Sequence, residues 1–527
     1  MRFFNTEGPV RPDDHYYLPP LQRWDLQEVL SLIAQKKYFL LHAPRQTGKT
    51  TCLLALMEYL NQEGRYRAIY ANLEGAQAYR EQVDPAMATI ITDLAGWAEQ
   101  WLGADSAGRV PALARQVLAA TPPGSALGAF LTQWCAASAQ PLVLLLDEVD
   151  ALVGDTLISL LRQLRAGYLK RPLAFPWTVI LCGVRDLRDY RIHASAEASP
   201  ITGGSAFNIK AESLRLGDFT TAEVNTLLLE HTQETGQVFT PEALARVWEL
   251  TQGQPWLVNA LAYQACFRDP AGRDRARPVS AASIDQAKEY LILNRVTHLD
   301  QLADKLREER VRRVIEPMLA GTQMEVVPED DRQYLVDLGL LRRDGAGGLV
   351  VANPIYREVL PRALASGPQD TLPRISPTWL RADGSLDAVR LLDAFLAFWR
   401  RHGQPLLGSA PYHEIAPHLV LMAFLHRVVN GGGTLEREYA IGFGRMDLCL
   451  RYGSLTLGME LKVWRDGEPD PLAEGLEQLD AYLAGLGLDT GWLVIFDRRG
   501  GQPPIAERTT LTPTLSPRGH AIQVIRA

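Results

Sequence analysis

The sequence predicts a multidomain α/β protein whose first domain is built on a parallel β-sheet. Short apolar runs, of the kind found in strands buried on both faces, alternate with helical stretches over residues 1–213. These runs are Tyr38–His42, Ala68–Leu73, Pro141–Asp147 and Trp177–Cys182. A glycine-containing loop joins the first run to a helical stretch at Thr50–Leu60, and this order of elements is typical of a doubly wound sheet.

Length and composition exclude several classes of protein. A chain of 527 residues is too long for one core, and about 150 residues per domain predicts three or four domains. The net charge of −7 argues against a protein that coats nucleic acid without specificity, although a local groove for nucleic acid stays open. There is no long apolar stretch and no secretory signal, so we expect no membrane span and a cytoplasmic location. The cysteines lie far apart without a CxxC pair, which argues against a disulfide framework or a zinc site.

The loop after the first strand predicts a nucleotide site. Residues 43–50 follow the pattern GxxxxGK[ST] except for Ala43 at the first glycine, a change that removes no ligand. In such a loop backbone N–H groups cradle phosphate, Lys49 reaches the β- and γ-phosphates, and the Thr50 hydroxyl binds Mg²⁺. The predicted contacts with ATP are therefore Ala43, Pro44, Arg45, Gln46, Thr47, Gly48, Lys49, Thr50 and Thr51.

Two acidic residues strengthen this prediction. Asp147 and Glu148 end a buried strand, where a Walker B pair is expected to hold Mg²⁺ through water and to polarise the attacking water. Acidic residues at strand ends are also commonly solvated or capping, but the two motifs together favour the nucleotide site. Arg185, at the end of the next strand, is either a γ-phosphate sensor or part of a surface salt bridge.

Residues from about 5 to 365 resemble the AAA-like ATPases related to the STAND and archaeal ATPase families. The resemblance rests on the loop from His42 to Thr51, the segment Leu146–Asp150, the Gly253-Gln-Pro255 helix and a winged helix that ends in Ala352–Tyr356. It implies that the helical and winged-helix parts form a lid that senses the nucleotide state, and that the protein is a molecular switch.

A second set of residues lies near the C-terminus. Glu460 and Lys462 are two apart on a predicted strand and so face the same side, while Asp447 begins the strand before. Glu414, on the preceding helix, can add a ligand. Carboxylates that hold one or two Mg²⁺ ions and a basic group that positions water are what phosphodiester hydrolysis needs. A strand with a surface Glu/Lys pair is the simpler alternative.

Residues 385–500 resemble the PD-(D/E)XK nuclease superfamily. Asp447 matches its metal-binding Asp, Glu460-Leu-Lys462 its (D/E)XK pair, and Glu414 its first-helix Glu. Gln478 and Tyr482, one helical turn apart, match a QxxxY element that some branches carry. The resemblance implies metal ligation by Glu414, Asp447 and Glu460, catalysis by Asp447, Glu460 and Lys462, and Mg²⁺ or Mn²⁺ as the ion.

Together these features predict five segments. Residues 1–213 form the P-loop ATPase core, 214–299 a helical lid, 300–365 a winged helix, 366–384 a linker, and 385–527 a nuclease-like α/β domain. Within the last, residues 502–519 have the composition of a loop.

Three classes of function remain open. The first is an ATP-regulated DNA endonuclease, a pairing typical of bacterial defence against phage or plasmid. The second is a signalling ATPase whose nuclease-like domain only binds nucleic acid or a partner, and the third is a DNA-processing motor. The acidic start of a helix at Glu329–Asp331 would repel DNA, so we expect the winged-helix region to contact another part of the chain or a protein trigger. A homo-oligomer stays open.

Overall fold

The computed structural model describes residues 1–102, 109–185, 191–192, 201–202, 210–294, 297–320, 327–345, 347–361, 377–409, 416–429, 433–441 and 444–527. It divides into two compact units, of which the first comprises Met1–Asn294 and Pro328–Asn353, and the second Arg295–Val327 and Pro354–Ala527. This division is coarser than the five predicted segments, whose boundaries stay predictions. No helix among the described residues is long and apolar enough to cross a membrane.

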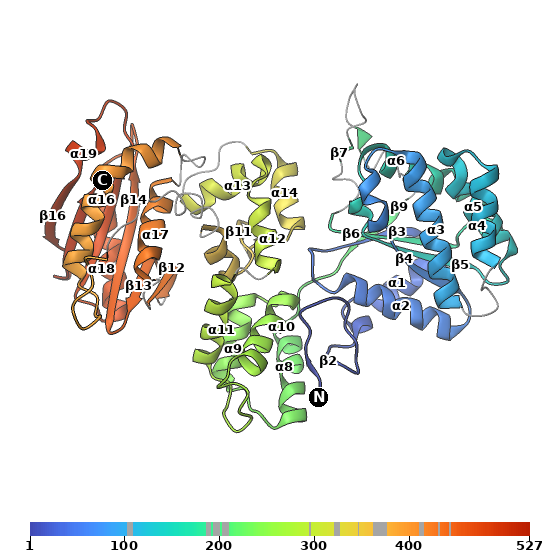
Figure 1. Cartoon of the computed structure of the whole chain (residues 1–527), viewed down its shortest axis with the longest axis horizontal. Helices are drawn as coiled ribbons and strands as arrows, with labels where there is room; N and C mark the ends of the chain where they lie inside the picture. Colours follow the sequence, from blue (N-terminus) through green and yellow to red (C-terminus); the bar gives the residue numbers. More distant parts are fainter. Residues whose placement is uncertain are drawn as a thin grey trace. The chain divides into compact units, whose positions relative to one another are not determined.

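The first unit is built on a parallel sheet (Figure 1). The strands are β3 (Tyr38–His42), β4 (Arg67–Asn72), β5 (Leu142–Asp147), β6 (Thr178–Gly183) and β9 (Lys210–Arg215). Their order is β4-β5-β6-β3-β9, and every neighbouring pair is parallel. The predicted parallel α/β core is therefore confirmed.

Helices cover both faces of this sheet. On one face α1 (Leu26–Ala34) and α2 (Lys49–Glu63) pack against one set of strand side chains. On the other lie α3 (Val83–Leu102), α4 (Arg109–Ala120), α5 (Pro123–Ala137) and α6 (Gly154–Gly167). Because side chains alternate between the two faces, Leu144 and Leu145 enter different cores, and β5 is buried along its whole length.

A helical region follows the sheet, as the sequence predicts. Its helices are α8 (Thr221–Thr235), α9 (Pro241–Thr251), α10 (Pro255–Tyr263) and α11 (Ala281–Leu293). Thr220 and Thr240 accept backbone hydrogen bonds from the first turns of α8 and α9, so both serve as N-caps. Two short antiparallel strands, β7 (Arg191–Ile192) and β8 (Ile201–Thr202), precede β9.

The predicted winged-helix region is divided between the two units. Helix α14 (Glu329–Asp337) and the antiparallel hairpin of β10 (Leu341–Arg343) and β11 (Leu349–Val351) belong to the first unit. Helices α12 (Thr297–Lys305) and α13 (Glu309–Ala320) belong to the second. The glycine-rich turn between the two strands of the hairpin lies where the sequence predicts it.

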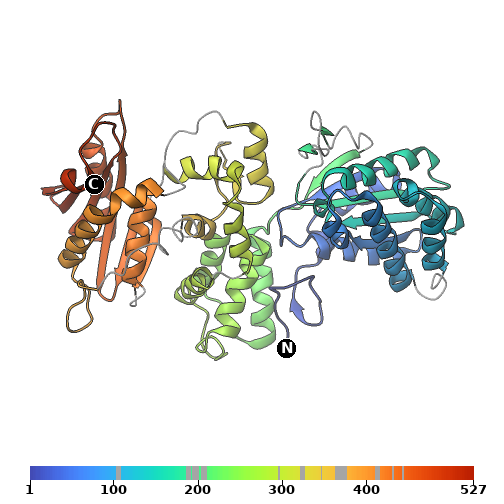
Figure 2. The same cartoon turned by 45° about the horizontal axis from the view of Figure 1, so that its top comes forward.

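The second unit holds a mixed sheet, shown in two views in Figures 1 and 2. Its strands are β12 (Gly433–Ile441), β13 (Gly444–Tyr452), β14 (Leu455–Trp464), β15 (Thr490–Asp497), β16 (Thr510–Leu515) and β17 (Ala521–Arg526). The order is β12-β13-β14-β15-β17-β16, with β15 parallel to both of its neighbours. Helices α16 (Ala388–Ser409) and α17 (Ala416–Val429) pack on one face, and α18 (Leu472–Leu486) packs on the other.

One secondary-structure prediction in this unit is wrong. The segment 502–519, predicted to be a loop, contains the short helix α19 (Ile505–Arg508) and the strand β16. Pro513 lies in the middle of β16 and lacks the N–H that a central strand needs. Strand β16 is at the edge of the sheet and pairs only with β17, so the proline is tolerated there. Because segment 502–519 is rich in turn-forming residues, its composition did not predict the edge strand.

Two predicted features lie outside the described residues. They are residues 366–376 of the linker and the candidate metal ligand Glu414.

Two glycines of the helical region allow a matched test of the packing. Gly253 and Gly236 both have left-handed backbones, with φ of 81° and 77°. A Cβ on Gly253 would lie 1.9 Å from the carbonyl oxygen of Phe219, whereas a Cβ on Gly236 would meet nothing within 4 Å. We expect Gly236→Ala to lower the free energy of unfolding by about 1 kcal/mol, and Gly253→Ala by roughly 3 kcal/mol or more. Denaturant unfolding measures both, and equal losses would contradict the close packing of Gly253.

Candidate functional site

The phosphate-binding loop lies between β3 and α2. Gly48 precedes α2 with φ of 92°, a backbone that suits glycine, and a Cβ there would lie 2.9 Å from a guanidinium nitrogen of Arg23. Lys49 is buried, and its Nζ donates to the carbonyl oxygens of Ala43 and Pro44, at 3.0 Å each. A lysine that bonds its own loop is already directed into the cradle where the phosphates are expected.

The two Walker motifs are joined by a hydrogen bond. The hydroxyl of Thr50 donates to Oδ2 of Asp147 at 2.7 Å, and Asp147 is fully buried at the end of β5. The N–H of Glu148 donates to Oδ1 of the same carboxylate at 2.9 Å. A hydroxyl and a carboxylate are hard oxygen ligands of the kind that Mg²⁺ prefers, so these residues fit a magnesium ion that accompanies ATP.

Glu148 lies beside this carboxylate in a left-handed backbone conformation, with φ of 55°. Burial, and then the negative charge of Asp147, raise the pKa of Glu148 above its usual value. A base with a raised pKa accepts a proton from water more readily than an ordinary carboxylate does. The environment of Glu148 therefore suits the role that the sequence predicts for it.

Arg185 follows β6 and lies near the same edge of the sheet. Its guanidinium group stacks on the ring of Tyr334 in α14, with 4.9 Å between the guanidinium carbon and the ring centroid. The carboxylate of Asp150 accepts a hydrogen bond from the N–H of Val184, the residue before Arg185. Sensing of the γ-phosphate by Arg185 stays a prediction, and the stacking on Tyr334 is a contact that the sequence did not indicate.

The turn after α14 packs against the phosphate-binding loop. A Cβ on Gly339 would come within 2.8 Å of the Pro44 ring, so only a glycine fits this contact. Arg215, at the end of β9, donates to the carbonyl oxygen of Val336 at 3.4 Å. These contacts explain why the segment Pro328–Asn353 belongs to the first unit.

A pocket with an empty volume of about 700 Å³, part of it open to solvent, lies beside the loop. Its wall combines Gln46–Gly48 of the loop with the beginnings of α2 and α10 and with the N-terminal segment, defined here as Arg2–Leu18. Apolar side chains such as Leu18 and Phe219 form part of the wall, as expected for a site that holds a nucleobase.

The N-terminal segment is fastened to both sides of this pocket. The strands β1 (Phe3–Phe4) and β2 (His15–Tyr16) pair in parallel within it. The N–H of Val10 donates to the Thr51 hydroxyl at 3.2 Å, and Trp256 Nε1 of α10 donates to the carbonyl oxygen of Thr6 at 2.9 Å. The segment therefore connects α2 to the helical region across the pocket.

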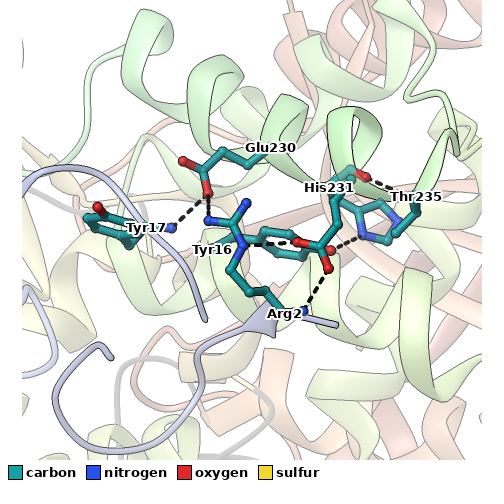
Figure 3. A network of polar contacts seen from close by, with 7 residues as sticks. Arg2, Tyr16, Tyr17, Glu230, His231 and Thr235 are labelled. Atoms are coloured by element: carbon teal, nitrogen blue, oxygen red, sulfur yellow. Dashed lines mark hydrogen bonds and ion pairs between the residues drawn. The ribbon is translucent and has the colours of Figure 1, made fainter. Parts of the chain in front are cut away.

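Polar contacts fix the start of this segment to α8 (Figure 3). Arg2 forms ion pairs with Glu230 at 3.1 Å and with Glu234 at 2.9 Å. The hydroxyl of Tyr16 lies 3.1 Å from Nδ1 of His231, which is completely buried. Burial lowers the pKa of His231, so this histidine is neutral near pH 7.

Arg23 ties the phosphate-binding loop to the entrance of the helical region. Its guanidinium group donates to the carbonyl oxygens of Thr47 and Gly217 and stacks on the ring of Phe219. No sequence motif predicts these contacts, because Arg23 is 24 positions from Thr47 and 194 positions from Gly217. These contacts join the phosphate-binding loop to the segment that precedes α8.

The second candidate site lies in the second unit, on the face of the sheet that α18 covers. Lys462 Nζ is 3.2 Å from Oε1 of Glu460 and 3.4 Å from Oε1 of Glu474, and it also donates to Oε1 of Gln478. Oδ2 of Asp447 accepts a hydrogen bond from the N–H of Leu461 at 2.8 Å. The structure thus brings Asp447, Glu460, Lys462 and Gln478 together, as predicted.

Glu460 is the most perturbed group of this site. It is 4% exposed, and its Oε2 has no hydrogen-bond partner among the described residues. Burial, and then the charge of Asp447, raise the pKa of Glu460 to about 8, although Lys462 acts in the opposite direction. Burial and the charge of Glu460 also raise the pKa of Tyr482, which indicates that Tyr482 lies near the carboxyl pair.

A metal at this site stays a prediction. No group of three or more His, Cys, Asp or Glu side chains within the described ranges could hold a metal ion. The predicted third ligand, Glu414, lies outside those ranges. The sequence motifs did not include Glu474, although it is one helical turn before Gln478 and its Oε1 accepts a hydrogen bond from Nε2 of Gln478 at 3.1 Å. The spacing of four residues between Glu474 and Gln478 on a predicted helix is the signal that could have placed Glu474 at this site.

A comparison with protein families identifies the first site. Residues 33–190 match the model of the AAA domain, and this range contains both Walker motifs. The chain contains an AAA-type P-loop ATPase domain. No curated protein sequence matches the chain.

Several solved structures are similar in part to this protein. The Walker-type ATPase PABY2304 of Pyrococcus abyssi is 15% identical, and the comparison covers 68% of this chain and 99% of that chain with a TM-score of 0.46. Cdc6p of Pyrobaculum aerophilum is 16% identical, with coverages of 66% and 93% and a TM-score of 0.34. The RuvB Holliday junction branch migration motor of Thermotoga maritima is 13% identical, with coverages of 62% and 92% and a TM-score of 0.33.

The raised pKa of Glu460 predicts that metal binding at the second site depends on pH. A carboxyl group with a pKa of about 8 is mostly protonated at neutral pH, and a metal ligand has to lose that proton. The affinity for Mn²⁺ should therefore rise as pH increases from about 6.5 to about 8.5. Calorimetric titration of the full chain measures this, and Glu460→Gln should remove the pH-dependent part. The same pH dependence in wild type and variant would contradict the assignment.

Proposed function

We propose that this protein is an ATP-operated switch whose C-terminal domain is a metal-dependent DNA nuclease. The hydrolysis of ATP rests on the AAA-type domain, which has both Walker motifs in contact. The nuclease half rests on one observation, which is that a buried carboxyl group, a second carboxylate and a lysine from the neighbouring strands β13 and β14 converge on one face of the sheet. The residues are Glu460, Asp447 and Lys462.

In the ATPase half each residue has a separate task. Lys49 supplies positive charge to the β- and γ-phosphates once they displace the loop carbonyls that it now contacts. A bound Mg²⁺ would neutralise developing negative charge, and Thr50 and Asp147 are the residues that would hold it. Glu148 accepts the proton of the attacking water or orients it.

The contacts of the phosphate-binding loop with the rest of the unit suggest how the hydrolysis of ATP changes the positions of other elements. Pro44 touches Gly339 after α14, and Arg23 joins Thr47 to Gly217. A change of the loop on phosphate binding would therefore move α14 and the helical region. This supports the proposal that the protein works as a switch.

Two substitutions separate binding from hydrolysis. Lys49→Ala removes the charge that clamps the phosphates, and we expect ATP hydrolysis to fall by at least about a hundredfold. Glu148→Gln should still bind ATP, because the amide keeps the shape of the side chain, but it should not turn over. Phosphate release and binding of a fluorescent ATP analogue measure the two effects.

The matched control is Lys37→Ala, at the other end of β3, which should hydrolyse ATP like wild type. Hydrolysis retained in purified Lys49→Ala protein would place the nucleotide site elsewhere in the chain.

The chemistry of the second site supports the proposed nuclease. The elements of this domain follow one another along the chain in the order α17, β12, β13, β14, α18 and β15. Two carboxylates can hold Mg²⁺ or Mn²⁺ beside a phosphodiester, and the ammonium of Lys462 can position the attacking water. The ion pair of Lys462 with Glu460 and its contact with Gln478 direct the ammonium group toward the carboxyl pair.

The nuclease half predicts that three substitutions abolish DNA cleavage and spare the ATPase. Asp447→Ala and Glu460→Ala each remove a metal ligand, and Lys462→Ala removes the group that positions water. Each should lower the cleavage of plasmid DNA in Mg²⁺ or Mn²⁺ by at least about a hundredfold. Gln478→Ala should be milder, because an amide carries no charge, and EDTA should stop the reaction.

Glu477→Ala is the matched control, because this exposed glutamate lies on α18 beside Gln478. It should cut DNA like wild type. Cleavage that persists in the Glu460→Ala preparation would come from a contaminating nuclease.

One observation favours the alternative that this domain only binds nucleic acid or a partner. Lys462 is shared among Glu460, Glu474 and Gln478, so its ammonium is already occupied by protein groups. If wild-type protein cuts neither DNA nor RNA in Mg²⁺ or Mn²⁺, with or without ATP, the binding role replaces the nuclease. The role in bacterial defence, a trigger protein and the oligomeric state stay predictions.

A further inference from the structure

The carboxylate of Asp147 has a side-chain partner outside the sequence motifs. Tyr70 donates its hydroxyl proton to Oδ2 of Asp147 at 3.1 Å, and the same oxygen accepts the proton of Thr50 at 2.7 Å. The N–H of Glu148 donates to Oδ1 at 2.9 Å. The thiol of Cys182 is a further hydrogen-bond donor to this carboxylate. A carboxylate offers about four lone-pair positions, so these donors leave it little freedom to rotate.

The sheet brings Tyr70 to this position. Strand β4 pairs with β5 so that Asn72 is opposite Asp147 and Tyr70 is opposite Leu145. The side chain of Tyr70 is 5% exposed and packs in the core between the sheet and α2, the helix that carries Thr50. Its ring also meets Trp97 of α3 edge-on, with ring centroids 5.8 Å apart. The hydroxyl is therefore fixed by packing as well as by its hydrogen bond.

Tyr70 can only donate to Asp147. Burial, and then the charge of Asp147, raise the pKa of Tyr70 far above its ordinary value, so the phenol keeps its proton. Cys182 of β6 lies on the opposite side of β5, and burial followed by the charge of Asp147 raises the pKa of its thiol as well. Neither side chain adds negative charge beside the carboxylate.

Thr50 and Tyr70, two of the side-chain donors to Asp147, differ in what they do when a cation binds. Thr50 is itself expected to give its oxygen to Mg²⁺, so its position depends on the ion. Tyr70 lies behind the carboxylate in the core and has no such second role. Its hydroxyl can therefore orient Asp147 whether or not the ion is present.

We propose that Tyr70 is a positioning residue for the magnesium ion that accompanies ATP. Its hydroxyl holds the Asp147 carboxylate in the orientation that the cation requires. This inference rests on the proposed use of Mg²⁺ by Thr50 and Asp147.

The test compares Tyr70→Phe with Tyr66→Phe in the full chain. Both tyrosines are buried in the same core, but the hydroxyl of Tyr66 has no hydrogen-bond partner among the described residues, so its removal breaks no such contact. Binding of a fluorescent ATP analogue is measured in EDTA and then over a series of Mg²⁺ concentrations.

We expect both variants to bind the analogue like wild type in EDTA. In Tyr70→Phe the Mg²⁺ concentration that gives half of the full effect on analogue binding should be about tenfold higher than in wild type, because a hydrogen bond to a charged group is lost. Tyr66→Phe should have the Mg²⁺ dependence of wild type. In an Asp147→Asn background Tyr70→Phe should cause little further change, because Tyr70 acts through that carboxylate.

Three results would overturn the inference. The first is an unchanged Mg²⁺ dependence in Tyr70→Phe, and the second is an equal loss of affinity for the ATP analogue with and without Mg²⁺. The third is a Tyr70→Phe protein that is unfolded, as measured by circular dichroism. The last two would show that the hydroxyl supports the fold and not the cation. If wild-type binding itself does not depend on Mg²⁺, the proposed metal use fails first.

Discussion

A carboxylate that leaves water has to receive hydrogen bonds or a cation, and each unit of this protein buries one beside a predicted site. In the first unit Asp147 is fully buried, and donors from α2, β4 and its own backbone surround it. In the second unit Glu460 is almost as buried, yet one of its oxygens has no partner among the described residues. The first carboxylate is oriented by these donors, whereas burial and the charge of Asp447 raise the pKa of the second to about 8.

The first carboxylate is connected to the phosphate-binding loop and, through it, to other parts of its unit. Because Asp147 bonds Thr50, the end of β5 fixes the start of α2 and with it the phosphate-binding loop. The loop in turn meets the turn after α14 through Pro44 and the helical region through Arg23. Phosphate binding is thus linked to two regions that are far away in the sequence. The N-terminal segment also joins Thr51 to α10 across the pocket.

The parts that the sequence predicted are those with a local pattern. A run of apolar residues in β5, the loop from Ala43 to Thr50, and the two-residue spacing of Glu460 and Lys462 each lie within about ten residues of sequence. Periodicity and motif chemistry act over that range. The parallel sheet, the two N-capping threonines and the convergence of the second site follow from such patterns.

The parts that the sequence did not predict depend on pairing between distant segments. Tyr70 is 77 residues from the aspartate that it contacts, and nothing near it in the chain marks it as different from other strand tyrosines. The contact of Gly339 with Pro44 likewise joins two segments of the first unit that are far apart in the sequence. The strand β16 was missed because Pro513 is compatible with an edge strand but suggests a turn when it is taken alone.

The proposal that ATP operates the nuclease is tested most directly by the effect of ATP on DNA cleavage. The initial rate of plasmid cleavage by the full chain would be measured in Mg²⁺ or Mn²⁺, with ATP and without it. We expect the rate of cleavage to differ between the two conditions, and this difference should disappear in Lys49→Ala protein. Cleavage at the same rate in both conditions, or no cleavage in either, would contradict it.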